Sequence, residues 1–582
     1  MPEIDLKDFT TLLKNLKKNT DGFKTIKLAV LADSASQFAV KAIKATGIEH
    51  GIKYDVFEAD YNQIDRQVFD PTSELYEFEP EYVLILRSTE KLIKQFYHLP
   101  GNARANFALD QAAGTADLYR QITDKLNAKV IINTYPEHND SVFGNFSGKT
   151  NLSFPYQIKR LNLGLMDLSQ EQRNLFLLQL DSLLAYSGYA AGFDAKMYIN
   201  GDMVYSLDLL PALAKNVQDI IQAASGTFKK CLILDLDNTT WGGIIGDDGI
   251  EGIQIGDLGI GKAFSELQLW ALELKKRGII LAVSSKNTEE IAKEPFEKHP
   301  DMKLRLTDIA VFMANWENKV DNLRHIQSVL NISFDSMVFL DDNPFEREMV
   351  KSAIPELTVP SLPEDPAEYL PYLRSLNLFE TVSFTAEDGQ RTLQYQEEAQ
   401  RSSLQKSFTN EAEFLQSLEM KAVIKPFDKF TIPRIAQLSQ RSNQFNLRTI
   451  RYTEDGIRAI AASDEYFTFS FNLTDKFGDY GLIAFVILKK KNAGTLFIDS
   501  WIMSCRVLKR GMELLTLTTI VDLAQKNGFK ILEGEYLPTP KNGMVKDHYE
   551  KLGFSATGEG KWELAVDGYA PANKLYINTA EA

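Results

Sequence analysis

The sequence predicts an α/β protein in which two domains with doubly wound parallel sheets precede one α+β domain. Three observations lead to this prediction. The chain has 582 residues, too many for one domain. Short β-rich runs alternate with helical stretches over roughly the first 380 residues, whereas the β-rich runs after about residue 421 follow one another directly. Hydrophobic residues make up 44% of the chain, enough to build packed cores.

The first domain is expected over residues 1–225. Apolar runs predict buried parallel strands at 25–33, 54–60, 81–88 and 128–135. Helical patterns lie between some of these runs, as in a Rossmann-like layer. The segment 160–226 is predicted to be largely helical, with a short strand near 196–199.

A second Rossmann-like domain is expected over residues 226–380, with little room for a cap. Its predicted strands are 229–238, 278–287, 308–315 and 336–343, and its predicted helices are 260–277, 288–299 and 317–331. The polar segment 381–420 is predicted to be a helical bridge. Residues 421–582 then show an antiparallel meander, a long helix, a strand and a short helix, which predicts an α+β domain.

Composition excludes several classes of function. The net charge of −15 argues against broad nucleic-acid binding, although a local basic pocket for a phosphorylated small molecule remains compatible with it. Two cysteines, Cys231 and Cys505, cannot form a disulfide framework. No apolar run approaches the ~18 residues of a membrane span, and the N-terminus does not resemble a secretion signal. We therefore expect a soluble, cytoplasmic protein.

Paired carboxylates follow two of the central strands. Asp235 and Asp237 come at the end of the 229–238 run, and Asp341 and Asp342 end the 336–343 run. The carboxyl ends of parallel strands are where α/β folds bind ligands. Acidic groups at adjacent strand ends repel one another unless a cation lies between them, and an all-oxygen ligand set favours Mg²⁺.

A hydroxyl and two ammonium groups extend this set. Ser285 closes the 278–287 strand and is followed by Lys286, and Lys319 opens the next predicted helix. Such groups converging on carboxylates and Mg²⁺ predict a phosphate-binding site. The alternative is that these acids only cap turns at strand ends.

This ordered set resembles the haloacid dehalogenase-like hydrolase superfamily. The resemblance implies that Asp235 is a nucleophile that forms an aspartyl-phosphate, and that Asp237 is the general acid/base. It implies phosphate binding by Thr239, Ser285, Lys286 and Lys319. It also implies Mg²⁺ binding by Asp235, Asp237 (through its carbonyl), Asp341 and Asp342.

Within this superfamily, the sequence most resembles the FkbH-like branch (subfamily IIIC), which has little or no cap domain. The similar stretches are CLILDLDNTTWGGIIGDDG, AVSSKN, NWENKVDNL and VFLDDNPFEREMV. The short gaps between these motifs leave no room for a large cap. An uncapped site implies access for a bulky phosphorylated substrate.

The C-terminal domain resembles the Gcn5-related N-acetyltransferases. In that family the loop before the long helix binds a CoA pyrophosphate at the helix N-terminus, which here points to Arg506 and Gly511. The resemblance implies acyl-CoA or phosphopantetheine binding, with Tyr549 as the group that protonates a thiolate. Cys505 is a candidate for a thioester, or else a small buried thiol. A scaffolding role for this domain is the alternative.

The N-terminal domain is weakly similar to SGNH-type hydrolases, on the strength of the run from Ala32 to Ser34 after the first strand. This similarity makes Ser34 a candidate nucleophile, with a helix N-cap as the alternative role.

Three functions follow from these predictions. The leading one is a Mg²⁺-dependent phosphatase or phosphotransferase acting on a phosphorylated intermediate of polyketide-type or surface-polysaccharide biosynthesis. The second is a glyceryl or acyl transferase that dephosphorylates 1,3-bisphosphoglycerate and loads an acyl carrier protein. The third is a non-catalytic scaffold that docks a carrier.

Overall fold

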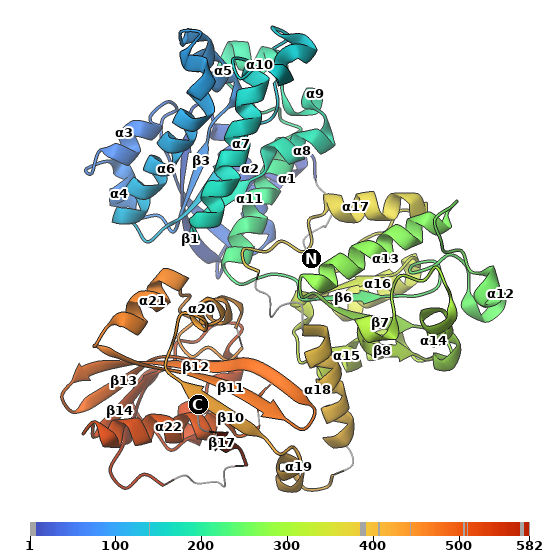
Figure 1. The fold of residues 1–582 in the computed structure, drawn as a ribbon, viewed down its shortest axis with the longest axis vertical. Coiled ribbons are helices and arrows are strands. Elements are labelled where there is room, and N and C mark those ends of the chain that lie inside the picture. The colour runs from blue at the N-terminus through green and yellow to red at the C-terminus, as the bar shows by residue number, and fades with distance from the viewer. Residues whose placement is uncertain are drawn as a thin grey trace. The chain divides into compact units, whose positions relative to one another are not determined.

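The computed structural model describes residues 7–138, 140–384, 391–405, 408–442, 444–504, 507–508, 510–570 and 576–580. The chain divides into two compact units, Met1–Gln222 and Ala223–Ala582 (Figure 1). The two parallel sheets and the third, mixed sheet described below confirm the predicted α/β class. Two predicted site residues, Cys505 and Arg506, lie outside the described residues.

The first unit is built on a five-stranded parallel sheet of order β2-β1-β3-β4-β5. Its strands are β1 (Lys24–Ala32), β2 (Ile52–Glu58), β3 (Tyr82–Leu86), β4 (Lys129–Asn133) and β5 (Leu175–Leu178). Its α-helices are α1 (Phe9–Leu13), α2 (Gln37–Glu49), α3 (Ile64–Phe69), α4 (Glu74–Phe78), α5 (Thr89–His98), α6 (Phe107–Lys125), α7 (Phe154–Glu171), α8 (Leu180–Ser187), α9 (Tyr189–Gly192), α10 (Ala195–Gly201) and α11 (Leu210–Ala224). Strand β3 is buried at every position, as expected for a parallel strand with helices on both faces.

The sequence prediction was wrong at two places in this unit. Strand β5 lies inside the stretch predicted to be helical, where its short apolar run pairs with β4. The predicted strand near 196–199 belongs instead to helix α10. The Asp194 carboxylate caps that helix by accepting from the backbone N–H groups of Lys196 and Met197, at 2.8 and 3.1 Å.

The second unit contains a four-stranded parallel sheet of order β8-β7-β6-β9. Its strands are β6 (Cys231–Leu234), β7 (Ile280–Ser285), β8 (Ile309–Ala314) and β9 (Met337–Leu340). Its α-helices are α12 (Ile245–Gly252), α13 (Gly261–Lys276), α14 (Glu289–Lys298), α15 (Lys319–Leu330), α16 (Pro344–Ala353) and α17 (Tyr369–Ser375). Strands β6 and β9 run in parallel with Cys231 opposite Met337 and Leu234 opposite Leu340, so both end at the same level.

The same unit contains an eight-stranded mixed sheet of order β15-β16-β14-β13-β12-β11-β10-β17. The strands are β10 (Lys421–Lys425), β11 (Tyr466–Asp475), β12 (Gly478–Asn492), β13 (Thr495–Met503), β14 (Ile531–Glu535), β15 (Ser555–Gly558), β16 (Lys561–Ala565) and β17 (Asn578–Ala580). The α-helices of this part are α19 (Glu411–Ser417), α20 (Ile432–Arg441), α21 (Glu454–Ala462), α22 (Met512–Lys526) and α23 (His548–Lys551). The meander β11-β12-β13 is antiparallel, as predicted.

Helix α18 (Arg391–Gln405) contacts both sheets of the second unit, through β8 and β12. Arg401 on this helix is fully buried, and its Nε and Nη2 atoms bind the two carboxylate oxygens of Asp475 at 2.7 and 2.8 Å. This two-pronged pairing compensates the burial of both charges and fastens the helix to the mixed sheet.

Within the described part of the chain, no helix is long and apolar enough to cross a membrane. Cys231 is a free thiol buried inside β6, and burial raises its pKa.

Candidate active site

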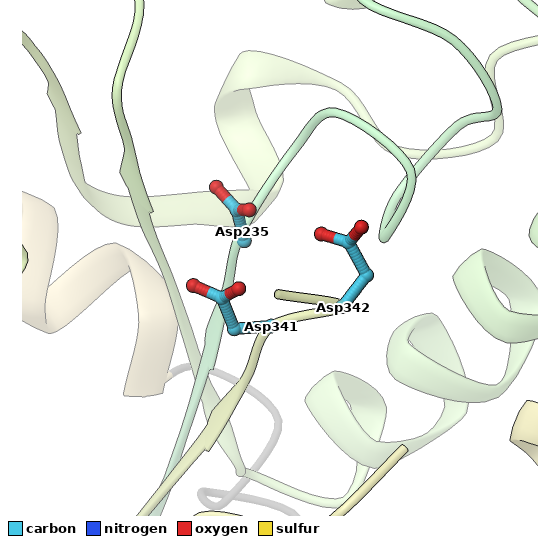
Figure 2. A group of neighbouring side chains, drawn as sticks. All are labelled: Asp235, Asp341 and Asp342. Atoms are coloured by element: carbon cyan, nitrogen blue, oxygen red, sulfur yellow. The ribbon is translucent and has the colours of Figure 1, made fainter. Parts of the chain in front are cut away.

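Three carboxylates meet at the carboxyl end of the central sheet. Asp235 directly follows β6, and Asp341 and Asp342 directly follow β9, so the parallel register places them side by side. One carboxylate oxygen from each of the three residues lies within 4.8 Å of the other two, and Figure 2 shows the three side chains together. The exposed fraction of Asp235 is 5% and that of Asp341 is 0%.

Lys319 supplies a positive charge to this cluster. It is the first residue of α15, whose N-cap Asn318 accepts a hydrogen bond from the Val320 N–H at 2.9 Å. Its ammonium lies 2.9 Å from Asp235 Oδ2 and 2.5 Å from Asp341 Oδ2. Three carboxylates against one ammonium leave two negative charges in excess, and the oxygen-only donor set fits a hard divalent cation such as Mg²⁺.

Burial and mutual repulsion perturb these groups. Burial raises the pKa of Asp235 to about 7, with Lys319 opposing this shift and Asp341 adding to it. Burial and the Asp341 charge also raise the pKa of Asp342. Burial lowers the pKa of Lys319, but attraction to Asp235 and Asp341 outweighs burial and raises it. The cluster thus resists full ionisation unless a cation is bound.

The chain turns sharply after Asp235. Asn238 adopts a left-handed backbone conformation with φ of 54°, and the N–H groups of Thr239 and Thr240 donate to the Leu236 carbonyl at 3.1 and 2.7 Å. The Thr240 hydroxyl donates to the Asp235 carbonyl at 2.6 Å. Asparagine tolerates the left-handed region better than most residues, so Asn238 suits this turn.

Asp237 points to its own set of donors. Its Oδ1 accepts from Trp241 Nε1 and from the Ile245 N–H, each at 3.0 Å, and its Oδ2 accepts from Asn287 Nδ2 at 3.0 Å. Burial raises the pKa of Asp237 despite the opposing hydrogen bonds from Ile245 and Trp241. A carboxyl group that is fixed in place and has a raised pKa is suited to giving and taking a proton.

Of the other predicted phosphate-binding residues, Ser285 and Thr239 lie at the strand ends, whereas Lys286 is paired with an acid. Ser285 ends β7 beside β6 and is 1% exposed. The Thr239 hydroxyl accepts from the Asp342 N–H at 3.0 Å and so ties the two strand ends together. Lys286 instead forms an ion pair with Glu346, with 2.5 Å between Nζ and Oε1.

Several residues of the site were missed from the sequence. Arg347 donates to the carbonyl oxygens of Asp341 and Asp342 at 2.8 and 2.6 Å, which fixes the turn after β9. The Tyr369 hydroxyl donates to the Asn238 carbonyl at 3.3 Å. Trp241 could have been found from its position inside the first acidic motif, whereas Tyr369 comes from a distant helix and carries no signal in the sequence.

The N-terminal candidate, Ser34, has no catalytic partner among the residues that the structure describes. Ser34 is 3% exposed, and in the described residues no histidine or carboxylate is hydrogen-bonded to its hydroxyl. Ser36, not Ser34, occupies the N-cap of α2, so the N-cap role expected for Ser34 was wrong. Asp33 accepts from the Ser88 N–H at 2.8 Å, and burial raises its pKa to about 6.

In the C-terminal part, a segment of the chain itself fills the gap between two strands. Strands β13 and β14 pair only over Thr495–Phe497 and Ile531–Glu533. Beyond that stretch, the Phe445 carbonyl accepts from the Met503 N–H at 3.3 Å and the Leu447 carbonyl accepts from the Leu537 N–H at 2.8 Å. The strand edge to which an extended ligand could add is therefore already occupied by this segment.

The other C-terminal candidates lie nearby. Gly511 has φ of 85° and precedes α22 as its N-cap, a conformation that glycine adopts without strain. Tyr549 is 1% exposed and packs so closely on Gly534 that a Cβ there would lie 2.4 Å from its ring. Burial raises the pKa of Tyr549, and its hydroxyl has no hydrogen-bond partner among the described residues.

Comparisons with known proteins fit this arrangement. Residues 27–222 match the family described as FkbH, N-terminal domain. The N-terminal part of the protein BF1531 from Bacteroides fragilis, a crystal structure containing a phosphatase domain complexed with Mg, is 50% identical; the match covers 65% of this chain and 100% of that chain, with a TM-score of 0.63. No curated protein matches the chain.

Two acetyltransferase structures match a smaller share of the chain. The ribosomal-protein-S18-alanine N-acetyltransferase from Escherichia coli is 17% identical, and the match covers 26% of this chain and 99% of that chain, with a TM-score of 0.20. The spermidine/spermine N-acetyltransferase SpeG from Vibrio cholerae is 13% identical, with coverage of 26% and 96% and a TM-score of 0.21. The N-terminal family match and the 50%-identical relative, which the chain covers in full, together place this chain in the FkbH family.

Proposed function

We propose that the second unit is a Mg²⁺-dependent phosphatase or phosphotransferase that uses Asp235 as its nucleophile. The observation that carries this proposal is the cluster of buried Asp235 and Asp341 with half-buried Asp342, in which Lys319 contacts the first two. The Mg-complexed phosphatase domain of the Bacteroides fragilis relative supports it.

The residues of the site have complementary roles in this reaction. An Asp235 oxygen attacks phosphorus, and the bond between phosphorus and the leaving oxygen breaks while Asp237 gives that oxygen a proton. Asp237 then takes a proton from the water that attacks the aspartyl-phosphate, which releases phosphate and restores Asp235. In this proposal Lys319 offsets negative charge on the phosphoryl oxygens, and the Ser285 hydroxyl donates to one of them.

Mg²⁺, when bound by the three carboxylates and the Asp237 carbonyl, would act as a Lewis acid that neutralises charge on the phosphoryl group. The fit rests on the excess of two negative charges and on the raised pKa of Asp235, both of which a divalent cation would relieve.

The substrate and the pathway of this phosphatase can also be proposed. We propose a phosphorylated intermediate of polyketide-type or surface-polysaccharide biosynthesis as the substrate, on the basis of FkbH-family membership. Acyl transfer to a carrier protein and a carrier-docking scaffold remain predictions from the sequence. Neither gains support from the strand edge of β13, which Phe445–Leu447 occupies.

Phosphate release from p-nitrophenyl phosphate in Mg²⁺ tests the proposal. We expect Asp235→Asn to lower kcat by about 10³-fold or more, since the amide is not nucleophilic. The matched control is Asp301→Asn, an exposed acid of the same unit, which should keep the activity of the native chain. Full activity of Asp235→Asn would overturn the proposal.

A further inference from the structure

A cavity of about 770 Å³ lies within the second unit, at the end of the central sheet opposite the carboxylate cluster. Its wall includes Lys230, which precedes β6, and Phe334–Ser336, which precede β9. Asp235 and Asp341 follow the same two strands at their other ends. At about 3.3 Å per residue, the five residues from Lys230 to Asp235 span roughly 16 Å, so the cavity is separate from the proposed phosphatase site.

The charge of this cavity is opposite to that of the carboxylate cluster. Its wall includes five basic residues, Lys230, Arg324, Arg434, Arg441 and Lys541. Among the described residues of the wall, the acids are Asp335 and Glu356, so the basic residues outnumber them by three. A concave wall with an excess of one sign of charge concentrates the field inside it, so the cavity attracts anions although the whole chain carries −15.

One of the two acids is already paired. Lys541 Nζ lies 2.5 Å from the Asp335 carboxylate, and Lys229 Nζ donates to the Asp335 carbonyl at 2.7 Å. Burial raises the pKa of Asp335, but Lys541 and a hydrogen bond from Ser333 outweigh burial and bring it to about 2. Burial lowers the pKa of Lys229 to about 8, and repulsion from Lys541 adds to that effect. Asp335 is therefore ionised at neutral pH and offsets the charge of Lys541, and this pair is already included in the count of basic and acidic residues.

Another part of the wall is apolar. It contains Phe334, Leu438, Phe445 and Met503. The ring of Phe445 packs edge-on against His548, with 4.9 Å between centroids, and His548 packs against Trp501 at 4.6 Å. Because buried aromatic rings hold Phe445 in place, this wall is preformed and offers a fixed apolar surface.

We propose that this cavity is a second ligand site, which binds a phosphate monoester carrying an apolar arm. Three arginines and two lysines match a doubly charged phosphate head, because guanidinium groups bind phosphate oxygens in pairs. The apolar wall takes the arm. This site is independent of the Mg²⁺-dependent chemistry at Asp235.

Calorimetric titration of the full chain with hexyl phosphate in EDTA tests the proposal. We expect saturable one-to-one binding that is at least ~10-fold tighter than that of inorganic phosphate, because several methylene groups leave water. We expect Arg324→Gln and Lys541→Gln each to weaken it by about 5-fold or more. Lys546→Gln, which changes an exposed lysine outside the cavity wall, is the matched control and should bind like the native chain.

The two sites can be tested separately. Asp235→Asn should retain hexyl phosphate binding in EDTA, and Arg324→Gln should retain hydrolysis of p-nitrophenyl phosphate. The Lys541 variant could fail to fold, and Arg324→Gln then still tests the proposal. The Arg324 side chain lies at the surface and its ion pair with Asp321 is exposed, so this substitution should not disturb folding. Unchanged affinity in both cavity variants, or binding lost only in Asp235→Asn, would show that hexyl phosphate binds elsewhere and would overturn the proposal.

Discussion

The two ends of strands β6 and β9 differ in charge although the strands between them are uniformly apolar. At the carboxyl ends, Asp235, Asp341 and Asp342 outnumber Lys319. At the amino ends, basic residues outnumber acids around a cavity. The strands themselves are fully buried and fix only the separation of the two ends. The residues just outside each strand therefore determine which charge a ligand must carry.

Removal of Lys319 should have the largest effect on this contrast. Lys319→Met leaves Asp235 and Asp341 buried without a cation when metal is absent, which typically costs about 3–5 kcal/mol. We expect the free energy of unfolding in EDTA to fall by about that amount and kcat to fall by about 10³-fold. Urea unfolding and p-nitrophenyl phosphate hydrolysis measure the two effects. A variant as stable and active as the native chain would show that the ammonium does not compensate the carboxylates.

Substitution of Asp237 should lower kcat without changing the affinity for Mg²⁺. Asp237→Asn keeps the shape of the side chain but cannot exchange a proton, so we expect a 10²–10⁴-fold loss of kcat. Because the Asp237 carboxylate is hydrogen-bonded to Trp241, Ile245 and Asn287, Mg²⁺ affinity should change little. Calorimetric Mg²⁺ titration checks this second expectation. Loss of Mg²⁺ binding would instead make the Asp237 carboxylate a ligand.

Addition of Mg²⁺ should stabilise the acidic end alone. At a Mg²⁺ concentration 100 times the Kd, binding to the folded state adds about 2.7 kcal/mol to the free energy of unfolding. We expect a higher Tm for the native chain and a much smaller shift for Asp341→Asn. A control with Asp335→Asn, which changes the acid at the other end of β9, should keep the full shift. Equal shifts in both variants would place the cation elsewhere.

The acidic end could be predicted from the sequence because its residues adjoin apolar strands. Asp235, Asp341 and Ser285 each stand at the end of a run that is recognisably a buried strand, and parallel strands bring such ends together. The strands of both parallel sheets were predicted for the same reason, except β5, a four-residue run that only its pairing with β4 distinguishes from the helices around it.

The cationic cavity could not be predicted in the same way. Its basic residues are separated by up to about three hundred positions, and they come from helices α15 and α20 and from loops of the second unit. Only folding brings them together. The sequence allowed for a local basic pocket in an acidic chain, but long-range packing alone determines where it lies. Tyr369 was missed for the same reason.

Substitution of one acid at each end of β9, Asp335 or Asp342, should change the free energy of unfolding in opposite directions. Both changes should be smaller than that of Lys319→Met. The folded-state pKa of Asp335 is about 2, below its unfolded value of 3.8, so the unfolded state binds more protons between these pH values. The stabilisation by Asp335 is therefore complete above about pH 4 and is lost as pH falls toward 2. After allowance for its partial exposure, we expect Asp335→Asn to cost about 1 kcal/mol at pH 7.

Asp342 should behave in the reverse manner. Burial and Asp341 raise its pKa, so its ionisation opposes folding when metal is absent. Asp342→Asn in EDTA should then leave stability at pH 7 unchanged or increase it, and the gain should shrink as pH falls and the native carboxyl becomes protonated. Urea unfolding of both variants at pH 7 and pH 3 measures this difference. If Asp335→Asn and Asp342→Asn destabilise the protein equally at pH 7, the two ends of the sheet do not have opposite electrostatic potentials.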